Sequence, residues 1–169
     1  MTQEELLAAI KEAREKSSTT VDWDNRGLSE LPPTISQLKK LELLLAGRNQ
    51  LTTLPPQIGG MRALETLELA NNSITTLPAS IGRLKSLEAL DLEGNRLTAL
   101  PDEFSGCTAL EELDLDKNQF TSVPQVLFQL KSLKTLYLTG NPLGDDAMEQ
   151  IKVLHEAGVD VYFDSKEAT

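Results

Sequence analysis

The sequence predicts an α/β repeat solenoid, with a parallel sheet of about seven short strands on the concave face and a capping helix at each end. The repeat is visible in two residue types that each recur five times at a constant 23-residue spacing. These columns are Asn49, Asn72, Asn95, Asn118 and Asn141, and Pro32, Pro55, Pro78, Pro101 and Pro124. Leucine, the commonest residue of the chain, fills much of the space between them. Constant spacing predicts stacked units that bury their apolar sides only against one another.

Each unit carries the pattern L-x-x-L-x-L-x-x-N-x-L, as in the run Leu64, Leu67, Leu69, Asn72 and Ile74. The L-x-L alternation has the period of a β-strand. The asparagine side chain can satisfy backbone groups in the bend after the strand, so we expect a structural role for it. The predicted strands lie near residues 20–24, 43–47, 66–70, 89–93, 112–116, 135–139 and 159–163.

The N-terminal end begins with a predicted amphipathic helix over residues 3–16, with Leu6, Leu7, Ile10 and Ala13 on one face. Thr2 and Glu5 form a capping box at its start. A degenerate first repeat follows, with Arg26 in the asparagine column and Trp23 opposite the small Ala46. This pairing predicts that large and small side chains compensate in volume between adjacent layers.

A second helix is predicted over residues 145–157, with Ala147, Met148, Ile151 and Leu154 directed inward. A further 23-residue step predicts that the last strand, 159–163, closes the array and that Asp164 continues the asparagine column. The predicted organisation is therefore a cap (1–17), five regular repeats after the degenerate one (18–143), and a second cap (144–169). Caps at both ends lead us to expect a complete protein or domain.

These motifs resemble the leucine-rich repeats of the 23-residue class, whose second half reads L-P-x-x-I-x-x-L, as in Leu77, Pro78 and Ile81. The chain is similar over residues 18–164 to short bacterial leucine-rich repeat proteins and to the Ras-suppressor and LAP-type repeats of animals. The resemblance implies a leucine-rich repeat arc that binds other macromolecules on its concave face. It does not identify the partner.

Composition excludes several classes of function. A net charge of −10 argues against binding to nucleic acid or to an anionic membrane surface, both of which need basic residues. We find neither an apolar run long enough to span a membrane nor a signal peptide, so the cytoplasm is the expected location, with a secreted form left open. A single cysteine allows neither an intramolecular disulfide nor a cysteine-built zinc site.

The sequence contains no recognisable catalytic constellation, so we expect no enzyme activity, cofactor or metal. His155 is the only histidine and falls late in the second predicted helix, where it suits a helix end. Cys107 occupies a column otherwise held by Leu38, Met61, Leu84 and Leu130, which predicts a small buried hydrophobe. The two residues belong to distant repeats, so they cannot form a nucleophile–base pair.

The positions between the strand leucines should face the concave side. Thirteen acidic and three basic residues fall there, a balance of −10 that equals the charge of the whole chain. The acidic residues are Asp22, Asp24, Glu42, Glu65, Glu68, Glu88, Asp91, Glu93, Glu111, Glu112, Asp114, Asp116 and Asp160, and the basic ones are Arg48, Lys117 and Lys134. The predicted central column reads Asp22, Leu45, Glu68, Asp91, Asp114, Tyr137 and Asp160, with Tyr162 one column further on. Basic residues recur instead in the turns before the strands, at Lys39, Arg62, Lys85 and Lys131.

We therefore predict a monomeric, non-enzymatic module whose acidic concave face binds a basic or mixed-charge protein. Aromatic side chains are preferred anchors in interfaces, and single-sign fields steer partners of opposite charge. The predicted contact residues are Glu68, Asp91, Glu93, Asp114, Asp116, Tyr137, Tyr162, Leu43 and Leu45. Two alternatives remain open at this stage: a structural or self-associating repeat protein, and an acidic face that binds a cation such as calcium.

Overall fold

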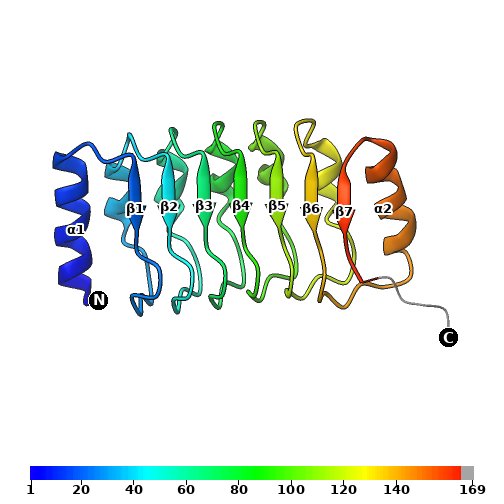
Figure 1. Cartoon of the computed structure of the whole chain (residues 1–169), viewed down its shortest axis with the longest axis horizontal. Coiled ribbons are helices and arrows are strands. Elements are labelled where there is room, and N and C mark those ends of the chain that lie inside the picture. Colours follow the sequence, from blue (N-terminus) through cyan, green and yellow to red (C-terminus); the bar gives the residue numbers. More distant parts are fainter. Residues whose placement is uncertain (165–169) are drawn as a thin grey trace.

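The computed structural model describes residues 1–164 and forms one seven-stranded parallel sheet whose strands follow chain order (Figure 1). The three-residue strands are β1 (Thr20–Asp22), β2 (Leu43–Leu45), β3 (Thr66–Glu68), β4 (Ala89–Asp91), β5 (Glu112–Asp114), β6 (Thr135–Tyr137) and β7 (Asp160–Tyr162). Behind the sheet lie the 3-10 turns η1 (Pro33–Gln37), η2 (Pro56–Gly60), η3 (Ala79–Arg83), η4 (Asp102–Gly106) and η5 (Gln125–Gln129). The predicted solenoid is confirmed, and every strand falls inside its predicted range.

The leucine columns form one continuous core between the sheet and the turns. The middle residue of each strand is buried, whereas its neighbours on either side are more exposed, as strand alternation requires. Cys107 is fully buried as predicted, and its Sγ donates to the carbonyl of Ile81 at 3.4 Å. Burial raises the pKa of the Cys107 thiol to about 11, so this side chain behaves as a hydrophobe.

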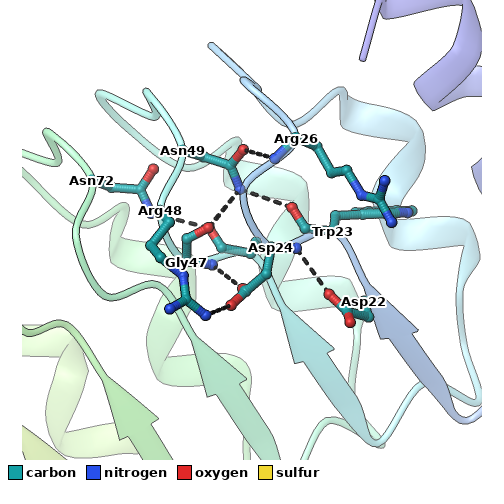
Figure 2. Close-up of polar contacts among 9 residues, drawn as sticks. Asp22, Trp23, Asp24, Arg26, Gly47, Arg48, Asn49 and Asn72 are labelled. Carbon is teal, nitrogen blue, oxygen red and sulfur yellow. Dashed lines mark hydrogen bonds and ion pairs between the residues drawn. The ribbon is translucent and has the colours of Figure 1, made fainter.

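The asparagines form the predicted structural ladder. Asn49 donates through Nδ2 to the carbonyls of Trp23 (2.9 Å) and Ala46 (3.0 Å). Its Oδ1 accepts from the backbone N–H of Arg26 at 3.0 Å, so one side chain links two repeats (Figure 2). The ladder is continuous because the Ala46 carbonyl also accepts from Asn72 of the following repeat at 3.0 Å.

Adjacent 3-10 turns approach each other closely at glycine. A Cβ on Gly82 would lie 1.8 Å from the carbonyl oxygen of Glu103, and one on Gly59 would lie 2.3 Å from that of Ser80. Gly106 has a similar restriction against the carbonyl of Gly82. No larger side chain fits these positions without moving backbone, so glycine sets the spacing of η2, η3 and η4.

The helix α1 (Gln3–Glu15) covers the first repeat and begins with the predicted Thr2–Glu5 capping box. Leu6 and Ile10 are buried and Ala13 is partly buried. The prediction was wrong for Leu7, which is 41% exposed. Leu7 follows Leu6 directly, and consecutive helical residues point about 100° apart, so both cannot face the core.

The helix α2 (Ala147–Glu156) is shorter than the predicted 145–157 and packs against β7 at the other end (Figure 1). Ala147, Ile151 and Leu154 are buried, as predicted. Met148 is 54% exposed, which corrects its predicted inward position. The buried residues are spaced four and three apart on one face, and Met148 lies outside that stripe. Within residues 1–164, neither helix is long and apolar enough to cross a membrane.

The register of the last strand departs from the 23-residue step. Thr135 pairs with Asp160 and Tyr137 with Tyr162, so the step here is longer by two positions. The connection between these strands contains the α-helix α2 where earlier repeats have a 3-10 turn, which accounts for the extra length. Tyr162, not the predicted Asp160, therefore ends the central column. Asp164 likewise does not take the asparagine position and instead accepts from the Gly140 N–H at 2.7 Å.

Candidate protein-binding surface

The side of the sheet that points away from the 3-10 turns is the surface predicted above to be concave, and we call it the strand face. Its central column is formed by the third residue of each strand. From β1 to β7 this column reads Asp22, Leu45, Glu68, Asp91, Asp114, Tyr137 and Tyr162. Glu68, Asp91 and Asp114 are direct neighbours on β3, β4 and β5, at a strand spacing of about 4.8 Å.

The aspartates of the central column are oriented by their own backbone. Asp91 Oδ1 accepts from the N–H of Glu93 at 2.8 Å, and Asp114 Oδ1 accepts from the N–H of Asp116 at 2.8 Å. Asp22 makes the equivalent bond with the N–H of Asp24 at 3.0 Å (Figure 2). Among residues 1–164, the second oxygens of Asp91 and Asp114 make no hydrogen bond, so they are available to accept from a ligand.

The three basic residues predicted for this surface each pair with an acid of the preceding repeat. The ion pairs are Arg48–Asp24 (2.9 Å, Figure 2), Lys117–Glu93 (2.5 Å) and Lys134–Glu111 (2.6 Å). Pairs this exposed contribute little to stability. One of these pairs involves a predicted contact acid, Glu93. The contact acids therefore fall into two groups, those with a partner from the following repeat and those without one.

Asp116 belongs with Glu93 because the partner of each comes from the following repeat: Asp116 Oδ1 accepts from the N–H of Thr139 at 2.6 Å. Asp91 and Asp114, by contrast, bond only to the backbone two residues further along their own repeat. Glu68, Asp91 and Asp114 form the other group, and within the described chain no salt bridge reaches them. These three carboxylates therefore define the centre of the candidate surface.

Their surroundings raise the pKa of all three central carboxyls. Partial burial is the largest cause for Glu68, Asp91 and Asp114, and it brings the pKa of Asp114 to about 6. Neighbouring carboxylates add repulsion: Asp91 acts on Glu68, and Asp116 acts on Asp114. Holding these groups together in charged form costs folding free energy at neutral pH.

Asp114→Asn should stabilise the protein more at pH 7 than at pH 5. The pKa of Asp114 is raised from 3.8 to about 6, so its destabilising charge is fully present above pH 6 and disappears toward pH 4. Asparagine keeps the oxygen that accepts from the Asp116 N–H. Allowing for solvent screening at this half-exposed site, we expect a gain at pH 7 on the order of 1 kcal/mol, or roughly 2–4 °C in Tm. Thermal unfolding at both pH values tests this, with Glu30→Gln, away from the strands, as the control; an equal gain at both pH values would contradict it.

The predicted apolar contacts lie on either side of the acidic centre. Tyr137 and Tyr162 stack with ring centroids 5.0 Å apart and an interplanar angle of 15°. Tyr162 is 53% exposed, and Tyr137 is half-buried, with its pKa raised first by burial and then by nearby Glu112. Leu43 and Leu45 are half-buried on β2, at the other side of the acids. All nine predicted contact residues thus fall on the strand face, in a Leu–acid–Tyr order along the solenoid.

The stacking of the two tyrosines was not predicted, because the 23-residue step placed Tyr162 in a different column. The signal that could have found it is the amphipathic helix before β7, which lengthens that connection. In residues 1–164, no group of three or more His, Cys, Asp and Glu side chains has an arrangement that could hold a metal ion. The cation-binding alternative therefore gains no support from the geometry.

Comparison with known families accounts for this architecture. Residues 66–157 match the model described as a leucine-rich repeat region. The chain belongs to the leucine-rich repeat family. A search of curated protein sequences returns no match. Leucine-rich repeat domains commonly mediate protein–protein interactions and are typically not enzymes.

Solved structures place this leucine-rich repeat protein near bacterial and plant relatives. A leucine-rich repeat protein of Leptospira interrogans is 37% identical with a TM-score of 0.82, and the match covers 90% of this chain and 39% of that one. An internalin of Listeria monocytogenes is 26% identical (TM-score 0.66; 80% and 40% covered). The ectodomain of the Arabidopsis thaliana membrane receptor kinase GASSHO1/SCHENGEN3, solved in complex with CASPARIAN STRIP INTEGRITY FACTOR 2, is 32% identical (TM-score 0.61; 68% and 14% covered). The chain thus spans about two fifths of the length of the two bacterial proteins, and less of the receptor.

Proposed function

We propose that this leucine-rich repeat protein binds a partner protein through its strand face, and that the partner contributes basic side chains. The observation that carries the proposal is the row of Glu68, Asp91 and Asp114 on adjacent strands. Partial burial and, after it, repulsion from neighbouring carboxylates raise the pKa of all three groups. Arg48 acts against this shift at Glu68, but no salt bridge within the described chain reaches any of the three. A lysine or arginine supplied by a partner would remove that cost.

The charged and apolar parts of the surface have different roles in this proposal. The acidic centre attracts and orients a basic partner, an effect that acts mainly on association and weakens as salt rises. The stacked tyrosines and the leucine pair supply contact area that salt does not weaken. The Arabidopsis receptor ectodomain, whose structure was solved with a bound factor, supports a binding role for related repeats.

The charge-reversal variant Asp91→Lys/Asp114→Lys should lose at least roughly tenfold of its partner capture at low salt, because mispaired like charges cost several kcal/mol across an interface. Capture from a native lysate at low and high salt, quantified by mass spectrometry, measures this. The residual binding should depend less on salt than that of the unmodified protein. Glu30→Lys/Glu156→Lys makes the same change in net charge at exposed positions outside the strand face and should preserve capture. An unchanged set of partners for the Asp91/Asp114 variant at every salt concentration would overturn the proposal.

A second variant separates the aromatic contribution from the charge. Tyr137→Ala/Tyr162→Ala should reduce capture of the same partners while leaving the slope of binding against salt concentration unchanged. If the tyrosine variant changed that slope as much as the charge-reversal variant does, the separate roles assigned to the tyrosines and the carboxylates would be contradicted.

A further inference from the structure

A basic groove lies on the turn side of the solenoid, across η1, η2 and η3. It is open to solvent, with a volume of about 780 Å³. Three basic side chains line it, Lys39, Arg62 and Arg83, and none of the described residues that line it is acidic. The groove is therefore electrostatically opposite to the strand face, although the chain as a whole carries a charge of −10.

Arg62 differs from the lysines of the repeats before and after it, Lys39 and Lys85. In the equivalent position, Lys39 donates to the Gly60 carbonyl at 3.1 Å and Lys85 to the Gly106 carbonyl at 2.6 Å. Both lysines thus close the 3-10 turn of the next repeat. Arg62 makes no such bond, and within residues 1–164 its guanidinium has no hydrogen-bond or ion-pair partner.

Arg83 is the second exception. The corresponding residues of the other turns are Gln37, Gly60, Gly106 and Gln129, so Arg83 is the only charged member of its column. Its guanidinium also lacks a partner among the described residues. The sequence thus adds two arginines to neighbouring turns, where like charges repel and neither bonds to the fold.

The floor of the groove is left open by glycine. Gly59 and Gly60 of η2 line it, and a Cβ on Gly60 would lie 3.2 Å from Ser36 Cβ and 3.3 Å from Lys39 Nζ. A side chain at that position would crowd Lys39. The absence of side chains there keeps the three cations accessible from the same opening.

The extent of the basic groove limits the ligand. Asp102 and Glu103 begin η4, directly beyond η3, and both are exposed. A long polyanion such as nucleic acid would extend from the arginines over these carboxylates and be repelled. A single group that concentrates about two negative charges, as a phosphate does, avoids them. Arginine forks match phosphate oxygens in bidentate geometry, and an open groove of about 780 Å³ has room for the chain segment that carries the group.

We propose that this groove binds a phosphorylated side chain on a segment of a partner protein, held by Arg62 and Arg83 with Lys39 beside them. The site is separate from the strand face, so a partner could engage one without the other.

Fluorescence anisotropy with a library of phosphoserine-centred peptides, and with the matched serine library, tests the proposal. We expect salt-sensitive binding of the phosphorylated library only. Arg62→Gln/Arg83→Gln should weaken it roughly tenfold or more, because two charge-assisted contacts are lost. The control Arg96→Gln/Lys131→Gln removes the same charge from exposed positions outside the groove and should leave binding unchanged.

Equal binding of both libraries, or equal affinity of the two double variants, would overturn the proposal. Complete displacement of the peptides by inorganic phosphate at a concentration similar to that of the peptides would also overturn it. Equally tight binding of the unmodified protein to phosphatidylserine vesicles would likewise reject a protein segment in favour of a lipid surface. Circular dichroism of both variants verifies that the fold is retained. Asp91→Lys/Asp114→Lys should bind the phosphorylated library at least as well as the unmodified protein, so this proposal and that for the strand face can fail independently.

Discussion

Asn95→Ala is expected to lower the free energy of unfolding by about 3 kcal/mol, because it leaves one buried backbone N–H without an acceptor and removes two further hydrogen bonds. Asn95 Oδ1 accepts the N–H of Ile74 at 2.9 Å, and Nδ2 donates to the carbonyls of Leu69 and Leu92 at 3.0 Å each. The two carbonyls each keep a second asparagine, Asn72 and Asn118 respectively. The Ile74 N–H loses its only acceptor, so most of the cost falls on that group.

Urea denaturation followed by circular dichroism measures this loss. Trp23, the only tryptophan, is buried in the first repeat and provides a second probe by fluorescence. Arg96→Ala changes the adjacent exposed residue and should shift the midpoint very little. If Asn95→Ala were no more destabilising than Arg96→Ala, the ladder would not be a source of stability.

Gly82→Ala is the second substitution with a large expected effect. Its Cβ would lie 1.8 Å from the Glu103 carbonyl oxygen, and because that atom is backbone, no rotamer change can relieve the overlap. Glycine-to-alanine changes normally reduce the entropy of the unfolded chain and stabilise by less than about 1 kcal/mol. Here η3 and η4 must separate, and overpacking of this kind costs about 3 kcal/mol.

Gly144→Ala provides the matched control. Its Cβ would lie 3.4 Å from the Thr121 carbonyl oxygen, an ordinary contact, and its backbone φ is not positive. Thermal unfolding should therefore show a lower Tm for Gly82→Ala and a Tm near that of the unmodified protein for Gly144→Ala. Similar Tm values for the two variants would show that the turns can separate without cost.

The sequence predicted the fold in detail wherever the 23-residue period applies. The asparagines, for example Asn72 and Asn95, locate each repeat in the sequence. Strand alternation then determines which strand residues face the core. The prediction was wrong where the period ends. Asp160 and Tyr162 were assigned by extending the 23-residue step across α2, and the longer connection shifts their register by two positions.

The candidate site was predictable in position but not in its interactions. Alternation alone places Asp91 and Asp114 on the strand face. Whether a carboxylate has a partner depends on side-chain reach between repeats, which the pattern does not encode. Lys117 forms an ion pair with Glu93 of the preceding repeat, whereas Asp91 has no salt-bridge partner among the described residues. Arg83 was missed because its column has no shared residue type that would mark it as a site.

The asparagine ladder also gives the solenoid a direction. Every ladder side chain donates to a carbonyl of the repeat before it, so the hydrogen bonds of each repeat depend on the repeat that follows. Asn49 bonds to the degenerate first repeat, and Asn141 bonds to the repeat that contains β5. An internal 23-residue unit is therefore interchangeable with any other, while the two ends are not. Duplication or loss of one such unit would lengthen or shorten the strand face by one row and leave both end caps intact. A chain of this design can change the size of its binding surface without a new fold.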